Sequence, residues 1–192
     1  MMKKFITILT VLVFSAGALN AQIFSKGSQV INAGIGFGHT YLGGVGYSIG
    51  LPAITASYEH GVVDIPISSD LDGAISVGGF LGYSNSSYRY SFWSDDLKYV
   101  YNSFLISARG NFHFVFHEKF DPYAGIHLGF LLVNGKWKGA GAPPGVWDAQ
   151  SSRFQGGGYV GGRYYFSDAI AVYSELGWML AYFHVGVSFK LN

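Results

Sequence analysis

The residues that could carry out chemistry are few in this chain of 192 residues, and they stand far apart along it. Five charged side chains alternate with small or apolar neighbours, and they comprise two acids and three bases: Glu59, Arg109, Arg163, Glu175 and Lys190. Acids and bases that share one buried surface are tolerated only if they pair and form hydrogen bonds. We therefore predict a structural charge network from these residues, with a path for protons or ions as the functional alternative.

Metal and phosphate sites find little support in the sequence. His113 and His117 are four positions apart, but the surrounding pattern is that of a strand, and the glutamate of a helical zinc motif is missing. Zinc requires three or four converging ligands, and the chain has no cysteine to supply them. Residues 34–38 are rich in glycine, yet no helical pattern follows that could bind an anion at its N-terminus. We expect neither a metal nor a cofactor.

Nucleophilic catalysis is also disfavoured. The chain contains no Gly-x-Ser-x-Gly motif of the kind that exposes a catalytic serine. Ser174 stands next to the acid Glu175, and His184 lies on the next predicted strand. The alternation of side chains places this serine and this histidine on opposite faces. The members of a catalytic triad must lie within hydrogen-bonding reach of one another. No catalytic residue is predicted.

The elements that position these residues are strands. Apolar residues alternate with polar or small ones over eight segments, and a period of two is the signature of a strand. The face that carries the five charges also carries His113, His127 and His184. Each strand would have roughly 9 to 11 residues, the length that a tilted strand needs to cross a bilayer. The segments cover residues 30–38, 54–59, 75–84, 103–114, 124–132, 160–166, 170–178 and 183–191.

Composition separates a barrel in lipid from a soluble sheet protein. Charged residues make up 12% of the chain and aromatic residues 18%, the formal net charge is +1, and 28 residues are glycine. A disordered chain or a basic nucleic-acid binder would need more charge, so both classes are excluded. A soluble sandwich would place Lys, Glu, Asp and Thr on its polar face. Here that face is mostly glycine and serine, which suits the narrow interior of an eight-stranded barrel.

The first residues predict an export signal. Lys3 and Lys4 precede an apolar run over residues 5–14, and small residues follow, as in a secretory signal peptide. The apolar run is too short for a membrane-spanning helix. Cleavage is expected after Ala18 or Ala21, which divides the chain into a signal peptide over residues 1–21 and a barrel domain over residues 22–192.

The connections between the strands alternate in length. Shorter links are expected at residues 64–73, 116–121 and 166–169, and longer loops at residues 39–52, 85–98 and 135–152. This alternation is typical of an outer-membrane barrel, with short turns on the periplasmic side and long loops outside. Aromatic side chains in two of the long loops form a candidate contact surface, with anchoring at the outer leaflet as the alternative. They are Tyr88, Tyr90, Trp93, Trp137 and Trp147.

Four sequence motifs in this order carry a family resemblance. They are DPYAG at residues 121–125, GGRYYF at residues 161–166, SELG at residues 174–177 and GVSFKL at residues 186–191. The chain resembles the small eight-stranded outer-membrane β-barrel family, which includes OmpX-like proteins and OmpA-type transmembrane domains, over about residues 28–192. The resemblance implies an all-β fold, namely an eight-stranded antiparallel up-and-down transmembrane barrel. No peptidoglycan-binding domain is expected, so the resemblance does not imply the wall-anchoring role of OmpA-type proteins.

The resemblance also implies a location and partners. The protein is expected in the outer membrane of a Gram-negative cell envelope, with both termini periplasmic. Its expected partners are outer-membrane lipids, including lipopolysaccharide, and the barrel-insertion machinery, which reads the terminal strand. No nucleic acid is expected, and a closed barrel has no free sheet edge that demands an oligomer, so a monomer is expected.

Three functions remain open at this point. The first is a non-enzymatic barrel with a side-chain-filled interior and a structural or surface-interaction role through its extracellular loops. The second is a small porin-like pore or transporter for ions or small solutes. The third is a lipid-modifying enzyme of the outer membrane.

Overall fold

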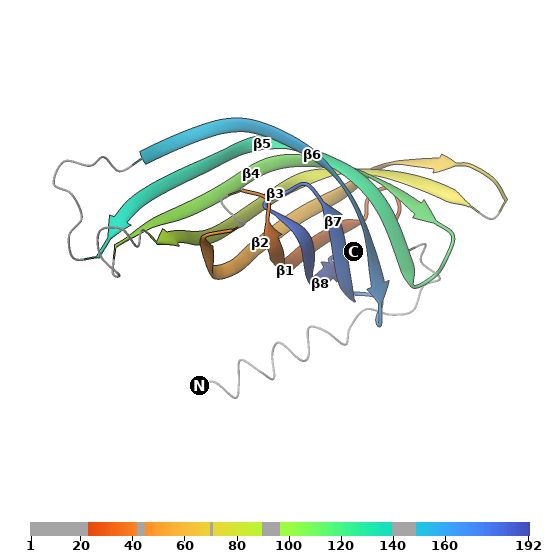
Figure 1. Ribbon diagram of the computed structural model, residues 1–192. Helices are drawn as coiled ribbons and strands as arrows, with labels where there is room; N and C mark the ends of the chain where they lie inside the picture. Colours follow the sequence, from red (N-terminus) through yellow and green to blue (C-terminus); the bar gives the residue numbers. More distant parts are fainter. Residues whose placement is uncertain (1–22, 42–44, 70, 90–96, 140–148) are drawn as a thin grey trace, which may run out of the picture.

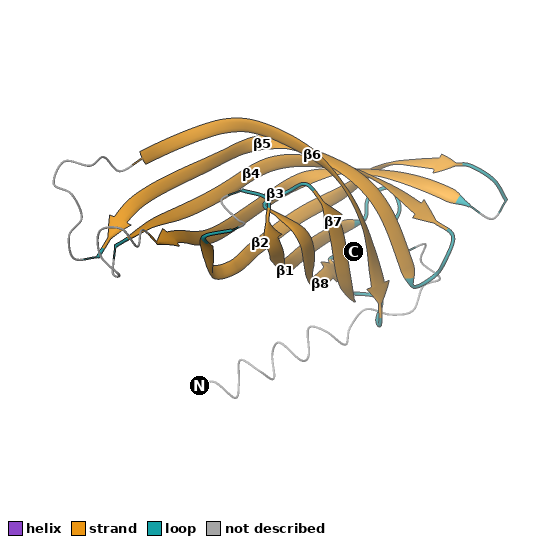
Figure 2. Ribbon diagram, viewed as in Figure 1, coloured by secondary structure: helices purple, strands orange, loops and turns teal. Residues whose placement is uncertain are grey.

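Eight antiparallel strands form a closed barrel in the computed structural model, which describes residues 23–41, 45–69, 71–89, 97–139 and 149–192 (Figures 1 and 2). The predicted number of strands and the predicted fold class are confirmed. Within the described residues, no helix is long and apolar enough to span a membrane. The strands are β1 (Gln29–His39), β2 (Tyr47–Pro66), β3 (Asp72–Arg89), β4 (Lys98–Val115), β5 (Phe120–Lys138), β6 (Ala149–Tyr165), β7 (Ile170–Gly177) and β8 (Ala181–Lys190).

The ring closes between the first and the last strand. Each strand pairs with the one that follows it in the sequence, and β1 pairs with β8 from Val30 opposite Lys190 to His39 opposite Ala181. Closure leaves these strands no unpaired edge within the ring, so the backbone donors and acceptors are satisfied by neighbouring strands.

Five strands are much longer than the sequence predicted. Strands β2 to β6 have 17 to 20 residues, whereas β1, β7 and β8 have 8 to 11. The long strands continue past the end of the ring as a sheet, drawn to the left in Figure 1, which we call the extension. It consists of residues 47–52, 84–89, 98–103, 133–138 and 149–153.

The extension corrects the prediction of long loops at residues 39–52, 85–98 and 135–152. Much of these stretches lies in strands, and the connections shrink accordingly. Its outer face carries mainly Asn, Lys and Ser and its inner face mainly Tyr, Trp and Ser, so neither face is consistently apolar and the contrast between the faces is weak. Their backbones are nevertheless paired across neighbouring strands, and Tyr and Trp favour that conformation.

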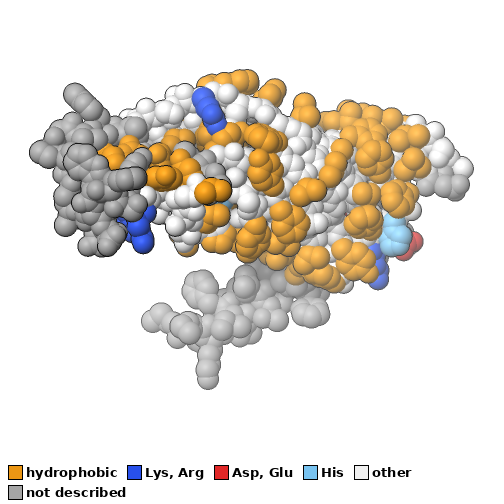
Figure 3. Space-filling view, viewed as in Figure 1, with side chains coloured by type: hydrophobic (Ala, Val, Ile, Leu, Met, Phe, Trp, Pro, Cys, Tyr) orange, Lys and Arg blue, Asp and Glu red, His pale blue; other side chains and the backbone are white. Residues whose placement is uncertain are grey.

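An apolar belt surrounds the ring on its outer face. Every one of the eight strands presents at least two large exposed hydrophobic side chains, among them Ile31, Ile54, Leu81, Ile106, Leu128, Val160, Leu176 and Phe189. In the space-filling view, hydrophobic side chains cover much of the visible surface, and the visible charged side chains lie on either side of this apolar surface (Figure 3). The residues between these exposed positions point into the barrel and are buried. Apolar side chains therefore cover the outside and charged side chains lie inside, which is the reverse of a soluble protein.

Candidate functional site

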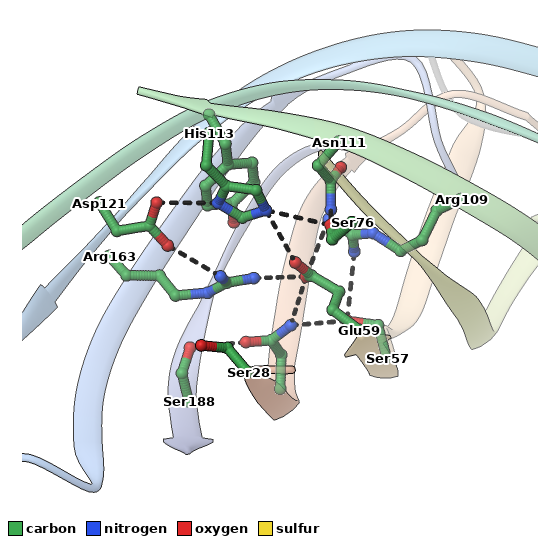
Figure 4. A network of polar contacts seen from close by, with 12 residues as sticks. Ser28, Ser57, Glu59, Ser76, Arg109, Asn111, His113, Asp121, Arg163 and Ser188 are labelled. Carbon is green, nitrogen blue, oxygen red and sulfur yellow. Dashed lines mark hydrogen bonds and ion pairs between the residues drawn. The ribbon is translucent and has the colours of Figure 1, made fainter. Parts of the chain in front are cut away.

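The interior of the ring holds a network of charged side chains (Figure 4). Arg109 on β4 places Nη2 at 2.6 Å from Glu175 Oε1 and at 3.5 Å from Glu59 Oε1. Arg163 on β6 forms an ion pair with Glu59 on β2 as well. The structure therefore brings together four of the five residues that the sequence singled out, and all four are buried.

Lys190 lies apart from these four residues. It is the last residue of β8 and pairs with Val30, at the end of the ring where Gln29 and Asn192 meet. Its Nζ donates a hydrogen bond of 3.1 Å to the carbonyl oxygen of Ile23, so it ties down the start of the described chain. The alternation placed Lys190 on the inner face, where Asp121 and Asp168 act on it electrostatically, but among the described residues no ion pair joins it to the other four.

Asp121 and His113 complete the network; the sequence placed His113 on the same face as the charges but did not identify Asp121. Arg163 Nη1 lies 3.0 Å from Asp121 Oδ2, and His113 Nδ1 lies 2.8 Å from Asp121 Oδ1. Asp121 was assigned to a link between strands, whereas the structure places it in β5, directly opposite Arg163. A signal was present, because Asp121 has the same parity as His127, which lies six residues, or three strand periods, further along β5. We call these six residues the charge network: Glu59, Arg109, His113, Asp121, Arg163 and Glu175.

Neutral polar groups add hydrogen bonds to the charge network, whereas Arg109 Nε, Arg163 Nε and Glu59 Oε2 have no hydrogen-bond partner. Asn32 Nδ2 donates to Glu59 Oε1 at 3.0 Å, and Ser188 Oγ donates to Asn32 Oδ1 at 2.6 Å. Tyr123 donates its hydroxyl proton to Glu175 Oε1 at 2.8 Å, and the guanidinium of Arg163 lies over the Tyr123 ring. Two guanidinium groups thus bridge three carboxylates, and hydrogen-bonded groups surround them, as buried charges require.

A short segment closes one end of the interior. Residues 23–28, which we call the N-terminal plug, run into the ring before β1 begins. Phe24 is fully buried and stacks on His113, with ring centroids 3.8 Å apart and an angle of 9° between the planes. Gly61 accepts a hydrogen bond from Gly27 and donates one to Ser28. A Cβ atom at Gly61 would collide with the carbonyl group of Ser25, so glycine is needed for this close approach.

The turn between β7 and β8 closes the other end. Met179 and Leu180 are each 1% exposed and pack with Phe80, Leu105 and other apolar side chains inside the ring. Several hydrogen bonds hold this turn to distant parts of the chain. Thr40 N donates to Leu180 O, His127 Nε2 contacts Trp178 O at 2.8 Å, and Trp178 N donates to Gly158 O. We call residues 178–180 the turn plug. Because residues 178–180 fold into the barrel interior, the connection between β7 and β8 is short, although it lies at the end of the barrel where long loops were predicted.

The charge network therefore lies between two apolar layers. Clusters of buried hydrophobic residues accompany the N-terminal plug on one side and the turn plug on the other. Charges enclosed in this way interact strongly with one another because water, which would screen them, is displaced. The arrangement joins inward side chains from five strands and so fixes the register among them.

The remaining candidate residues do not assemble into reactive sites. Ser174 is exposed on the outer face of β7, whereas His184 is buried inside on β8, so they cannot belong to one triad. His117 follows β4 in a turn and accepts a hydrogen bond from Lys119 N, far from the interior face of His113. Over the residues that the structure describes, no group of three or more His, Asp or Glu side chains could hold a metal ion. Gly34 and Gly36 lie in β1, where they leave room for the rings of Tyr173 and His184.

The predicted contact surface is only partly described. Tyr88 lies in β3 and Trp137 in β5, both half-buried on the face of the extension that continues the barrel interior. Each contacts another aromatic ring: Tyr88 lies 5.2 Å from Tyr47 and Trp137 lies 4.9 Å from Tyr99 between centroids. Tyr90, Trp93 and Trp147 lie outside the described residues.

Comparison with known proteins yields likenesses of fold. No family model and no curated protein sequence matches the chain. The structure of Ail, the attachment invasion locus protein of Yersinia pestis, in complex with the heparin analogue sucrose octasulfate is similar with a TM-score of 0.49 and 10% identity, over 86% of this chain and 96% of that one. The N-terminal β-barrel domain of Pseudomonas aeruginosa OprF gives a TM-score of 0.47 and 15% identity, over 88% of this chain and 100% of that one. The fold assignment rests on the closed ring of eight strands described above, and on that ground the predicted resemblance to small eight-stranded outer-membrane barrels is confirmed for the fold alone.

Proposed function

We propose that this protein is an integral barrel of the Gram-negative outer membrane with a filled interior, and that it acts through its outer surfaces as a structural or surface-interaction protein. The apolar belt is the observation that carries this proposal. All eight strands contribute to it, so the belt is continuous around the ring. Soluble monomers rarely expose contiguous apolar patches larger than a few hundred Å², and a full belt matches the lipid-facing band of a barrel.

The orientation follows from the two ends of the barrel. The N-terminal plug and the C-terminal residue meet at one end, where Asn192 accepts a hydrogen bond from Gln29 N and donates one to Gly27 O. Short turns lie at the same end, and we propose that this end is periplasmic. The extension then lies on the cell surface, where its strands and their connections can meet outer-leaflet lipid, including lipopolysaccharide, or a macromolecular partner.

The filled interior favours this function over a pore. A conducting barrel needs a hydrated path along its whole length, whereas here two apolar plugs flank a charge network whose acids and bases are paired. The described residues give no support for an enzymatic role. Ser174 and His184 face opposite sides of the barrel wall, so they cannot act together.

Two experiments test the proposal. Expressed protein should appear in outer-membrane fractions and migrate as a heat-modifiable band, whereas soluble protein in the periplasm would overturn the membrane assignment. Purified, refolded protein in planar bilayers should show no steady channels, whereas discrete and reproducible conductance steps would overturn the filled interior and favour the pore.

A further inference from the structure

The turn plug borders on buried polar side chains that have no hydrogen-bond partner. On the inner face of β4, Ser107 follows Leu105, and it lies opposite Phe80 on β3. Leu105 and Phe80 belong to the apolar cluster that packs around Met179 and Leu180. Ser107 is 6% exposed, and its hydroxyl group forms no hydrogen bond. A polar group is therefore buried directly next to the apolar cluster of the turn plug.

Three further side chains continue this pattern on other strands. His184 on β8 lies edge-on to the Phe80 ring at 6.0 Å between centroids, and both of its ring nitrogens lack a partner. Gln155 on β6 is 8% exposed, and neither atom of its amide group is hydrogen-bonded. His127 on β5 contacts Trp178 O through Nε2, but its Nδ1 has no partner. We call these four residues the polar layer: Ser107, His127, Gln155 and His184.

The polar layer differs from the charge network in how well its groups are satisfied. Each carboxylate and each guanidinium of the charge network forms at least one ion pair. In contrast, the side chains of Ser107, Gln155 and His184 form no hydrogen bond. Buried polar groups in folded proteins are nearly always hydrogen-bonded, and an unpartnered one destabilises the state that buries it. Water that reaches the polar layer would therefore stabilise an open form of this end of the barrel.

The turn plug is held by hydrogen bonds at the rim of the barrel. Thr40 supplies two of them, from its backbone N to Leu180 O and from its hydroxyl group to Met179 O. Trp178 N donates a third to Gly158 O. These bonds join neutral groups, and Thr40 follows the last residue of β1, so the attachment depends on a short segment at a strand end.

The turn plug can move without unpairing the strands on either side of it. The pairing of β7 with β8 ends at Leu176 and Phe183, so residues 178–180 lie beyond the last pair. Trp178 and Tyr182 are exposed on the outer face at this rim. A turn that swings outward would therefore bring its two buried apolar side chains next to exposed aromatic rings of the belt.

We propose that the turn plug is a lid, which opens at the rim and gives water and small solutes access to the polar layer. This inference goes beyond the proposed function, and it relies on membrane insertion only for the apolar surroundings of the open lid. The charge network and the N-terminal plug keep their own contacts below the polar layer, so the opening of the lid does not require a pore.

The test uses the absence of cysteine from the chain, which allows a single cysteine to report access. Ser107→Cys places the thiol in the polar layer. The matched control is Ser76→Cys, because Ser76 is also buried on the inner face but is hydrogen-bonded to His113 and Asn111. Each variant of the mature chain is refolded in phosphatidylcholine vesicles and treated with iodoacetamide, and mass spectrometry follows the modified fraction over time. We expect Ser107→Cys to react about tenfold faster or more, because the rate follows the population of the locally open state.

A second change tests whether Thr40 holds the lid. Thr40→Val in the Ser107→Cys background removes the hydroxyl that donates to Met179 O, and it should raise the rate of modification about threefold or more through the loss of one hydrogen bond. The matched control is Thr55→Val, which removes the hydroxyl that donates to Gly34 O away from the turn plug. This control should leave the rate unchanged.

The outcomes separate the lid from the proposed function. Equally slow modification of both cysteines would overturn the lid and leave the filled interior intact. Fast modification of both would overturn the lid and the filled interior together. Equal acceleration by Thr40→Val and Thr55→Val would indicate general loosening of the barrel, and it would also overturn the lid.

Hydrogen exchange of the unsubstituted protein provides a readout that does not depend on the folding of any variant. The amide of Trp178 is bonded to Gly158 O in the turn plug, and the amide of Gly61 is bonded to Ser28 O at the N-terminal plug. We expect the Trp178 amide to exchange faster, because local opening exposes it without unfolding of the ring. Exchange at Trp178 as slow as at Gly61 would overturn the lid.

Discussion

The pair Arg109–Glu175 offers a quantitative test of the sealed interior. Arg109 Nη2 and Glu175 Oε1 are 2.6 Å apart, and both side chains are 2% exposed. Replacing either one by leucine leaves the other charge buried without its main partner, which costs about 3–5 kcal/mol in comparable buried pairs. Glu59 is held independently by Arg163 and Asn32, so the rest of the charge network keeps its pairing.

The double variant R109L/E175L should recover most of this loss. It removes both charges together, and apolar replacement of a buried pair is often neutral or stabilising. We expect the double variant to lie within about 2 kcal/mol of the wild type, which gives a coupling energy of several kcal/mol. Because buried pairs are poorly screened, the coupling should persist at high salt.

The assay is reversible urea unfolding of the protein in lipid vesicles, followed by tryptophan fluorescence and by the heat-modifiable band. The exposed Lys119→Leu change serves as the control and should alter the unfolding free energy by less than about 0.5 kcal/mol. If the single substitutions at Arg109 and Glu175 each lower the unfolding free energy by less than about 1 kcal/mol, the pair behaves like a solvent-exposed ion pair. That result would refute the reasoning, because it requires water to reach the charge network.

Three further predictions concern the plug, its anchor and the belt. Phe24→Ala should lower the unfolding free energy by about 3–5 kcal/mol, as expected for a buried aromatic ring, and urea titration measures it. Gly61→Ala should release the N-terminal plug because its Cβ would meet the carbonyl group of Ser25, whereas Gly79→Ala, with only one atom near its Cβ, should be tolerated; limited proteolysis near the N-terminus distinguishes them. Leu128→Arg, in the belt, should weaken membrane insertion by about 2–4 kcal/mol if it lies near the mid-plane, and equal insertion yields from denaturant would contradict the position of the belt.

The sequence was most informative where one face of a strand differs strongly from the other. In the ring, large apolar residues point outward and glycine, serine or a paired charge points inward, so period-two counting placed Glu59, Arg109, Arg163 and Glu175 on one surface. It was least informative in the extension, where both faces are polar or aromatic. There the pairing of backbones, which sequence polarity does not report, decides that residues such as Tyr88 and Trp137 belong to strands.

Contacts between residues far apart in the sequence were also not predicted. The six residues of the N-terminal plug show no periodicity, and their positions depend on partners at Gly61 and His113 far along the chain. Asp121 was missed for a related reason. Pro122 follows it and the charged residues Glu118 and Lys119 stand shortly before it, which favours a turn, yet Asp121 pairs opposite Arg163 within the barrel wall.

The meeting of the two chain ends has a consequence for the order of assembly. The contacts between β1 and β8 join residues about as far apart in sequence as the barrel allows, and the same place carries the bonds from Lys190 to Ile23 and from Asn192 to Gly27. Loops this long close late because their ordering entropy must be offset by contacts made elsewhere. The first and last strands of the folded domain therefore pair with each other after the other strand pairs have formed. A bulky tag fused directly before Ile23 or after Asn192 would slow that last step while leaving the other seven pairings to form.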